Sequence, residues 1–249
     1  RSTLFPYTTL FRSRTGQNTG KIIPENPKPK TGNANIYIYQ PPKHLAIPGK
    51  IYASLAYVIK EQYHFKMIPV NKVNGKYRFS FKAPDSTEVL IIGINDDKNN
   101  LVDNNNELGF ISYLYNKNGK NTASARIAAM DLLSYYAIRP LKLNDAKLKP
   151  VMIRLFEEAY KMSPALRKEQ PYYTYYLTIL YQEKKDAVKN KLLAYAKQMA
   201  SSAHDETKWV NAIKIYELLE MNKEQRAVEQ KAIDRKSTRL NSSHRTGSR

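Results

Sequence analysis

The chain has 249 residues, of which 42% are hydrophobic, with a formal net charge of +19 at pH 7 and no cysteine. This composition indicates a globular protein. It also excludes disulfides, thiolate catalysis and cysteine-based zinc or iron–sulfur sites within the chain. No apolar run is long enough to span a bilayer. The lysines are spread along the whole chain, so we expect a solvated basic surface and not a nucleic-acid-binding face.

The two ends of the chain fit no structural pattern. Residues 1–13 (RSTLFPYTTLFRS) resemble a translated sequencing-library adaptor along their whole length, and residues 234–244 (DRKSTRLNSSH) resemble its partner. We therefore expect 1–13 and 234–249 to be adaptor-derived and not native, and we set them aside; the alternative is a genuine basic tail. On this interpretation the natural chain is cut at both ends. Subtracting the six net positive charges of the two ends leaves +13 for the remaining 220 residues, 14–233.

The first part of the remaining chain is predicted to contain short strands. Residues 14–32 hold four proline or glycine breaks within KIIPENPKPKTG, which predicts an extended lead-in without strand pairing of its own. Residues 35–39 alternate isoleucine with tyrosine, the period of a half-buried strand. Residues 50–65 place their apolar side chains on one face. Helix is the competing interpretation, but the β-branched and aromatic content favours one long strand.

The next strands are predicted from their turns. Residues 67–73 and 77–82 flank Asn74-Gly75, the preferred pair for a two-residue type I′ turn. Residues 89–94 form a near-continuous apolar run, which is typical of a central strand, and residues 110–115 alternate again. About six strands at this spacing are typical of an immunoglobulin-like sandwich, which we predict for residues 33–121.

From Thr122 the apolar residues recur at intervals of three and four, the period of a helix. Pro140 ends the first helix, and Asn144 is placed to cap a second helix that ends at Ser163-Pro164. Because the connections are short, neighbouring helices are expected to be antiparallel. Further helices are predicted at 172–184, 186–200, 206–220 and 223–233.

The predicted fold class is therefore α+β with two domains. The first is the immunoglobulin-like antiparallel β-sandwich. The second, residues 122–233, is an all-α array of helical pairs in the style of tetratricopeptide-like repeats, although the full repeat signature is absent. We expect two separately buried apolar cores that meet just past Gly119.

An oxygen-rich loop at residues 96–107 is the first candidate site. Asp103, Asn105 and Glu107 have the alternating spacing of a calcium-binding loop. However, Leu108 stands where the sharp turn requires glycine, and no bidentate glutamate follows at the twelfth position. Asparagine and aspartate are also ordinary turn residues, so we expect no metal site. The loop's other oxygen donors are Asp96, Asp97, Asn104 and Asn106.

The tyrosine-rich segment 171–176 (PYYTYY) is the second candidate, because exposed aromatic rings can stack on bases or sugars. Its spacing favours a simpler interpretation. Tyr172, Tyr175, Tyr176 and Ile179 fall at helical intervals, which indicates packing between neighbouring helices.

The remaining titratable residues form no catalytic pattern. His44, His64 and His204 are far apart in sequence, and no His-x-His or His-Glu-x-x-His pairing occurs. Glu157-Glu158 is expected to form solvated pairs with the lysines of its helix. Neither a glycine-rich phosphate loop nor a nucleophile elbow is present. We therefore predict no catalytic, cofactor-binding or metal-binding residues, and we expect the chain as it stands not to be an enzyme.

One resemblance covers about residues 22–233. The segments IIPENPKPKTGNANIYIY, GINDDKNNLVDNNNELGF and YNKNGK, with the Asn74-Gly75 hairpin and the helices that follow, resemble the N-terminal, non-catalytic region of extracytoplasmic bacterial thioredoxin-like (redoxin) disulfide reductases. In that family a reductase domain with a Cys-x-x-Cys motif follows the helices. This chain has no such motif, so no catalytic residue is carried over.

The resemblance implies a periplasmic or cell-envelope location and a module that holds or presents a reductase domain. It implies a protein partner, either the missing reductase domain or another envelope protein, with no nucleic acid and no membrane insertion. An alternative is a free-standing protein- or peptide-binding module that uses the helical array. A third is a glycan-binding envelope protein that uses its tyrosine-rich surface.

Overall fold

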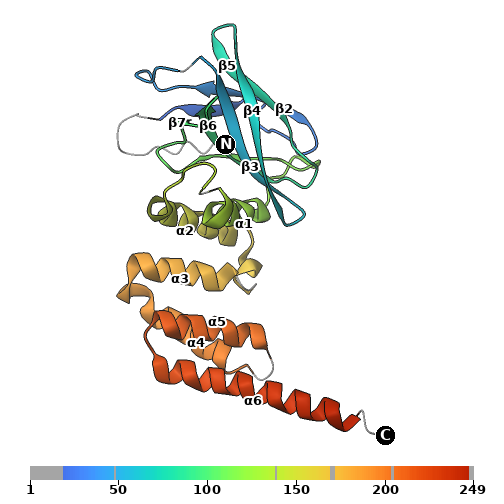
Figure 1. Cartoon of the computed structure of the whole chain (residues 1–249), viewed down its shortest axis with the longest axis vertical. Coiled ribbons are helices and arrows are strands. Elements are labelled where there is room, and N and C mark those ends of the chain that lie inside the picture. Colours follow the sequence, from blue (N-terminus) through green and yellow to red (C-terminus); the bar gives the residue numbers. More distant parts are fainter. Residues whose placement is uncertain (1–18, 48, 138, 169–171, 203–204, 247–249) are drawn as a thin grey trace, which may run out of the picture. The chain divides into compact units, whose positions relative to one another are not determined.

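The computed structural model describes residues 19–47, 49–137, 139–168, 172–202 and 205–246 (Figure 1). Within these ranges the chain is α+β, with eight strands in a curled antiparallel sheet followed by six α-helices, which confirms the predicted class. The chain divides into two compact units, and the second begins at Ala165. The adaptor-like residues 1–13 and the start of the lead-in, residues 14–18, lie outside the described residues.

All ladders between the strands are antiparallel. Along the sheet the strands follow the order β1-β2-β5-β4-β3-β6-β7, and β8 also pairs with β6. The strands are β1 (Lys21–Pro24), β2 (Ala34–Gln40), β3 (Ile51–Ile59), β4 (Gln62–Val73), β5 (Lys76–Lys82), β6 (Val89–Asp96), β7 (Leu101–Asp103) and β8 (Phe110–Tyr113).

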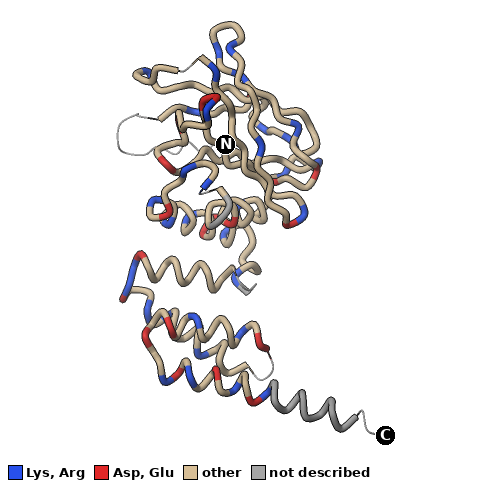
Figure 2. The backbone as a smooth tube through the Cα atoms, in the orientation of Figure 1, with Lys and Arg blue, Asp and Glu red and all other residues tan. Residues whose placement is uncertain are grey.

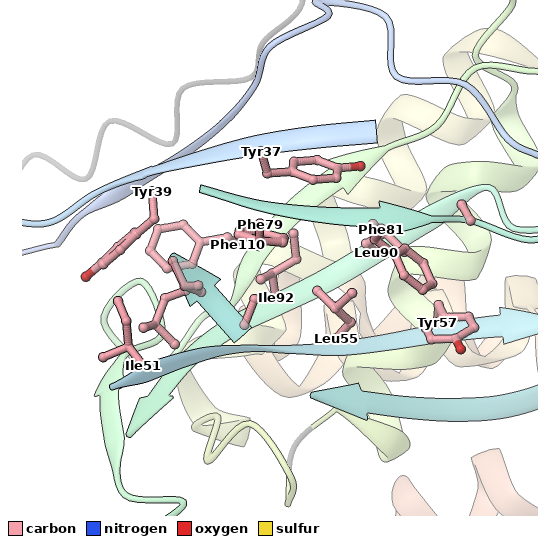
Figure 3. Close-up of a cluster of buried hydrophobic side chains, with 14 of the residues drawn as sticks. Tyr37, Tyr39, Ile51, Leu55, Tyr57, Phe79, Phe81, Leu90, Ile92 and Phe110 are labelled. Carbon is pink, nitrogen blue, oxygen red and sulfur yellow. The ribbon is translucent and has the colours of Figure 1, made fainter. Parts of the chain in front are cut away.

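Strand β4 joins two layers of this sheet. Its residues 62–70 pair with β3, whereas residues 71–73 pair with β5. One layer therefore holds β1, β2, β5 and the end of β4, and the other holds the start of β4 with β3, β6, β7 and β8. The curl brings the inner faces of the two layers together (Figure 3).

The main apolar core of the first unit lies between these inner faces (Figure 3). Tyr37, Phe79 and Phe81 come from one layer, Leu55 and Ile92 from the other, and none of the five is more than 5% exposed. The rings of Tyr37 and Phe79 stack with centroids 5.2 Å apart. Such a pair contributes about 0.5–1.5 kcal/mol beyond the burial of its surface. Buried and exposed side chains alternate along β2 and β5, and the buried ones form one side of the shared core.

The predicted single strand over residues 50–65 is wrong, because the chain reverses within it. Lys60 and Glu61 have φ angles of 46° and 66°, the left-handed values of a two-residue hairpin turn, and β3 pairs with β4 across them. Neither residue favours this conformation, so their identities did not indicate a turn. By contrast, the predicted turn at Asn74-Gly75 is confirmed, with φ angles of 50° and 75°.

Replacing Lys60-Glu61 with Asn-Gly should stabilise the first unit by about 1 kcal/mol, because both new residues tolerate positive φ better. Urea denaturation followed by circular dichroism measures the gain. Lys43→Asn, at an exposed position outside the strands, is the control and should change stability little. Equal or lower stability of the Asn-Gly variant would show that the turn is not strained.

The lead-in was predicted to lack strand pairing, and this is also wrong. Residues Lys21–Pro24 form β1, which pairs with β2 from Lys21 opposite Gln40 to Pro24 opposite Tyr37. Because β1 lies at the edge of the sheet, it needs hydrogen bonds on one side only, and Pro24 stands at its last residue. Proline and glycine therefore limit the length of this strand without preventing it.

The first helices belong to the same compact unit as the sheet. Helix α1 (Ala123–Asp131) continues into the π-helical turn η1 (Leu132–Tyr136), and α2 (Asp145–Met162) follows after the Asn144 cap. Helix α1 packs on β6 and η1 on β3, so the outer face of these strands is covered as well as the inner face (Figure 1). Strand β6 is accordingly buried from Val89 to Asn95.

The predicted domain boundary between residues 121 and 122 therefore lies inside the first unit, which ends at Pro164. The physical reason is that β6 is apolar on both faces, and α1 and η1 cover the face that the sheet core leaves open. Instead of one helical array over 122–233, α1, η1 and α2 belong to the same compact unit as the sheet, and a separate group of helices begins at α3.

The second unit stacks its helices in chain order. Helix α3 packs on α4, α4 on α5 and α5 on α6. A short 3-10 turn, Pro164–Lys168, precedes them. Their bounds are α3 (Tyr172–Lys184), α4 (Asp186–Ala200), α5 (Glu206–Leu218) and α6 (Asn222–Thr246). The four predicted helices are thus confirmed, although α6 extends through the adaptor-like residues 234–244, whose origin stays a prediction. Among the described helices, none combines the length and apolarity needed to cross a membrane.

Candidate functional site

The oxygen-rich loop links β6, β7 and β8, and its first turn closes on Asp96. The Asp96 Oδ1 atom accepts hydrogen bonds from the backbone N–H groups of Lys98 and Asn100, at 2.9 and 2.7 Å. Its Oδ2 atom accepts one from the Asn100 side chain at 2.8 Å. These hydrogen bonds, chiefly that from the Asn100 side chain, hold the pKa of Asp96 below its usual range. Asp97, beside it, is exposed.

The second turn of the loop, residues 103–109, is held by asparagine side chains. Asn105, Asn106 and Glu107 have positive φ, and Gly109 follows with φ 71°. The Asn105 side chain donates to the Gly109 carbonyl at 2.9 Å, and the Asn104 Oδ1 atom accepts from the Glu107 N–H at 2.9 Å. Asparagine tolerates the left-handed region and bonds nearby backbone, which explains why this turn is rich in it.

Asp103 ties the loop to the beginning of the described chain. Its Oδ2 atom accepts hydrogen bonds from the Gly20 N–H at 2.8 Å and from the Tyr39 hydroxyl at 2.9 Å, and its Oδ1 atom accepts one from the Asn105 N–H at 3.0 Å. Asp103 is only 7% exposed. A Cβ atom on Gly20 would lie 2.6 Å from both Asp103 Oδ2 and the Gln40 carbonyl oxygen, so this contact requires glycine. The carboxylate therefore fastens β1 and β2 to the end of β7.

On its other side the loop holds the segment that leads into α2. The Asn104 side chain donates to the carbonyls of Leu141 and Lys142, both at 2.9 Å. The Glu107 carbonyl accepts from the Asn144 N–H at 3.0 Å, and the Glu107 carboxylate pairs with Lys147 at 2.6 Å. The hydrogen bond from Lys147 is the main reason that the pKa of Glu107 lies below its usual value.

These contacts define what we call the loop clasp, residues 96–109 with their partners on β1, β2 and α2. Asp103 and Glu107 are two of the three residues at calcium-loop spacing. Their carboxylates do not converge, because each binds a partner on a different side of the loop. Asp103 contacts the lead-in, and Glu107 contacts α2. Within the described ranges, no group of three or more histidine or acidic side chains is placed to hold a metal ion.

The buried tyrosines of the first unit predict a loss of stability in alkali. Burial raises the pKa of Tyr37 and of Tyr113 to about 12. Burial, together with the negative charge of Asp103, also raises the pKa of Tyr39. An unfolded tyrosine has a pKa of about 10. The folded state therefore retains protons that the unfolded chain loses, so stability should be full below about pH 10 and fall above it.

Denaturation of the first unit at increasing pH, together with the absorbance of tyrosinate, measures this effect. Tyr113→Phe should make the loss above about pH 10 shallower, because one proton fewer is retained on folding. Ionisation of all tyrosines near their ordinary pKa in the folded protein would contradict the expectation.

A second polar cluster lies between β8, α1 and α2. Arg126, on α1, is 8% exposed, and its Nε atom lies 3.6 Å from Glu158 of α2. Arg154 pairs with the same carboxylate at 3.7 Å, and the Arg126 guanidinium lies 4.2 Å from the centre of the Tyr113 ring. The expectation that Glu158 pairs with solvated lysines is therefore wrong, because the sheet brings a buried arginine from another helix to it. The sequence did not indicate a role for Arg126. The spacing of the apolar residues around it predicts a helix but not a partner for its guanidinium group.

The tyrosine-rich segment packs between helices. Tyr173 meets Tyr195 of α4 edge-on with ring centroids 5.1 Å apart and stacks on Tyr176 at 6.0 Å. Tyr176 and Ile179 are buried, whereas Tyr172 and Tyr175 are half-buried. These contacts support the packing interpretation. Pro171 lies outside the described residues.

The two described histidines lie on different elements of the fold. His64 stacks on Tyr57 with ring centroids 5.4 Å apart, and His44 is exposed in the loop after β2. His204 lies outside the described residues. Glu157 is exposed on α2.

A shallow hollow lies at one end of the sheet, between the end of β2 and the Asn74-Gly75 turn. Its volume of about 220 Å³ is below the range of about 300–1,000 Å³ typical of small-molecule sites. Its lining includes Lys76, Tyr39 and Tyr77. Lysines and arginines lie on strands, loops and helices of both units, interspersed with acidic residues (Figure 2). Comparison of the chain with protein-family models, curated proteins and solved structures found no match.

Proposed function

We propose that the region from about residue 22 to residue 233 forms the non-catalytic scaffold of a cell-envelope thioredoxin-like thiol–disulfide reductase. In this proposal the sheet unit corresponds to the immunoglobulin-like region of that family and the helices to its tetratricopeptide-like pairs. The role of the scaffold is to hold or present a reductase domain in the periplasm, with that domain or another envelope protein as its partner.

The loop clasp is the observation that best supports a scaffold role. The polar residues that most resemble a binding site are Asp103, Asn104 and Glu107. Each of them spans between separate parts of the first unit. Their hydrogen bonds fix the lead-in and α2 against the sheet. Side chains used in this way give a rigid frame, which suits a module that positions another domain.

The gene sequence downstream of residue 233 is the direct test. The expected result is a thioredoxin-type domain with a Cys-x-x-Cys motif downstream of residue 233. The complete protein should then reduce insulin disulfides in the presence of dithiothreitol, and a serine variant of the two cysteines should not. A complete gene without such a domain would refute the proposal.

The second candidate is a free-standing module that binds a protein or peptide through its helices. What favours it is that α3 to α6 form a compact unit of their own and that Val210, on α5, is 49% exposed. Co-purification of a defined partner with the full chain, lost in Val210→Asp but not in the exposed Lys214→Asp on the same helix, would favour this candidate. Retention by both variants would count against it.

A further inference from the structure

The outer face of the layer formed by β1, β2 and β5 carries isoleucines among basic residues. Strand register places Ile23 opposite Ile38 and Ile38 opposite Arg78, so these three side chains share one face. Ile36 lies on the same face, since residues two apart in a strand point the same way. Ile23 and Ile36 are 36% and 41% exposed, unusually high for side chains in the middle of strands. We call this surface the isoleucine–lysine face.

The charged strand residues of this face are all basic. Lys76 and Lys82, which alternate with Arg78 along β5, are both exposed, and Lys21 lies across the ladder on β1. Among the strand residues of the face none is acidic. Glu25, just after β1, forms an ion pair with Arg78. Three lysines therefore remain around a group of exposed isoleucines.

We propose that the isoleucine–lysine face binds the surface of an anionic lipid bilayer. Lysines attract anionic headgroups, and exposed isoleucines gain free energy when they enter the boundary between headgroups and acyl chains. A second copy of this face is a poor partner, because its lysines would meet lysines. This contact is peripheral, and it does not rest on the proposed link to a reductase domain.

The shape of the face favours a bilayer over an acidic peptide. A peptide is usually held in a groove or along a free strand edge. Here Ile36 and Ile38 stand on β2, which is paired on both sides, and the hollow of about 220 Å³ lies at the end of the sheet beside Lys76. A broad lipid surface can contact all the isoleucines and lysines of one sheet face at once.

Co-sedimentation of the full chain with vesicles tests the proposal. Vesicles of phosphatidylglycerol and phosphatidylcholine in equal parts should bind the protein, and pure phosphatidylcholine vesicles should bind it much less. Binding should weaken at high salt, since the screening length falls from about 10 Å at 0.1 M to about 3 Å at 1 M. Absence of binding to the anionic vesicles would overturn the proposal.

Two charge variants distinguish vesicle binding through this face from non-specific electrostatic attraction of a basic protein to the vesicles. Lys76→Gln with Lys82→Gln should weaken binding about 25-fold, because each lysine near an anionic surface contributes roughly five-fold. Lys189→Gln with Lys191→Gln removes the same charge from exposed positions on α4 and should change binding less than about two-fold. Equal loss in both variants would overturn the assignment to this face.

A matched apolar pair tests the isoleucines. Ile36→Ser should weaken binding about ten-fold, whereas Val210→Ser, at a similarly exposed position on α5, should leave it unchanged. Thermal unfolding would establish that both variants are folded. An unchanged affinity in Ile36→Ser would overturn insertion of the isoleucines. Binding to polyglutamate but not to vesicles would overturn the proposal and assign the face to an acidic protein segment.

Discussion

Replacing Trp209 with alanine is expected to destabilise the second unit by about 3–5 kcal/mol. Trp209 is 2% exposed, and its indole N–H donates to the Ser202 carbonyl at 2.9 Å. Lys231 of α6 lies over the ring at 4.9 Å from its centre and donates to the carbonyls of Ala200 and Ser202. The variant loses the packing of a large ring, one hydrogen bond at the end of α4 and the cation–π contact between Lys231 and the ring.

Hydrogen exchange read separately over the two units measures this effect without relying on tryptophan fluorescence. Amides of α4, α5 and α6 should lose protection, while those of β3 and β6 should keep it. Val210→Ala, at the neighbouring exposed position, should stay within about 0.5 kcal/mol of the parent. Equal loss of protection across both units would contradict their division near Pro164.

The second large effect is expected for Asp103→Ala, which should destabilise the first unit by about 3–5 kcal/mol. The substitution removes the acceptor for the Gly20 N–H, the Tyr39 hydroxyl and the Asn105 N–H. A buried donor left without a partner costs about 1–3 kcal/mol, and the three costs are only partly additive.

Urea denaturation and hydrogen exchange at Gly20 and β1 measure this loss. Asp103→Asn should be milder, because the amide oxygen replaces one of the two carboxylate oxygens as an acceptor, while the amide NH2 group faces the donor on the other side. Asp97→Ala changes an exposed aspartate of the same loop and should be nearly neutral. Similar stability of Asp103→Ala and Asp97→Ala would show that the loop clasp does not hold β1.

The role of the loop could be predicted from the sequence only in part. Its asparagines and aspartates indicate turns, because their side chains bond nearby backbone, and Asp96 does so with Asn100 four residues away. Asp103 bonds Gly20, which is 83 residues away, and Tyr39, which is 64 away. Contacts at such separations depend on which strands become neighbours, and local residue patterns carry no such information.

The same limit applies to the cluster at Arg126. Helical spacing correctly predicted α2 and placed Glu158 on it, but not the partner that α1 supplies. Arg126 and Glu158 meet because α1 and α2 pack against each other beside the sheet. The sequence indicated two amphipathic helices, and the packing decided which polar side chains share a buried space.

Local patterns in the sequence were enough to determine the α+β class, the Asn74-Gly75 turn, the buried strand β6 and the helices from α2 to α5. The helices follow from side chains that repeat every three to four positions, the turn from a residue pair that tolerates positive φ, and β6 from a continuous apolar run. Only the tertiary structure decided that Lys60-Glu61 reverses the chain, that β1 joins the sheet edge and that α1 and η1 belong with the strands. These features arise where the burial of a distant apolar face outweighs the local preference of the chain. For example, α1 and η1 cover the second apolar face of β6 and β3.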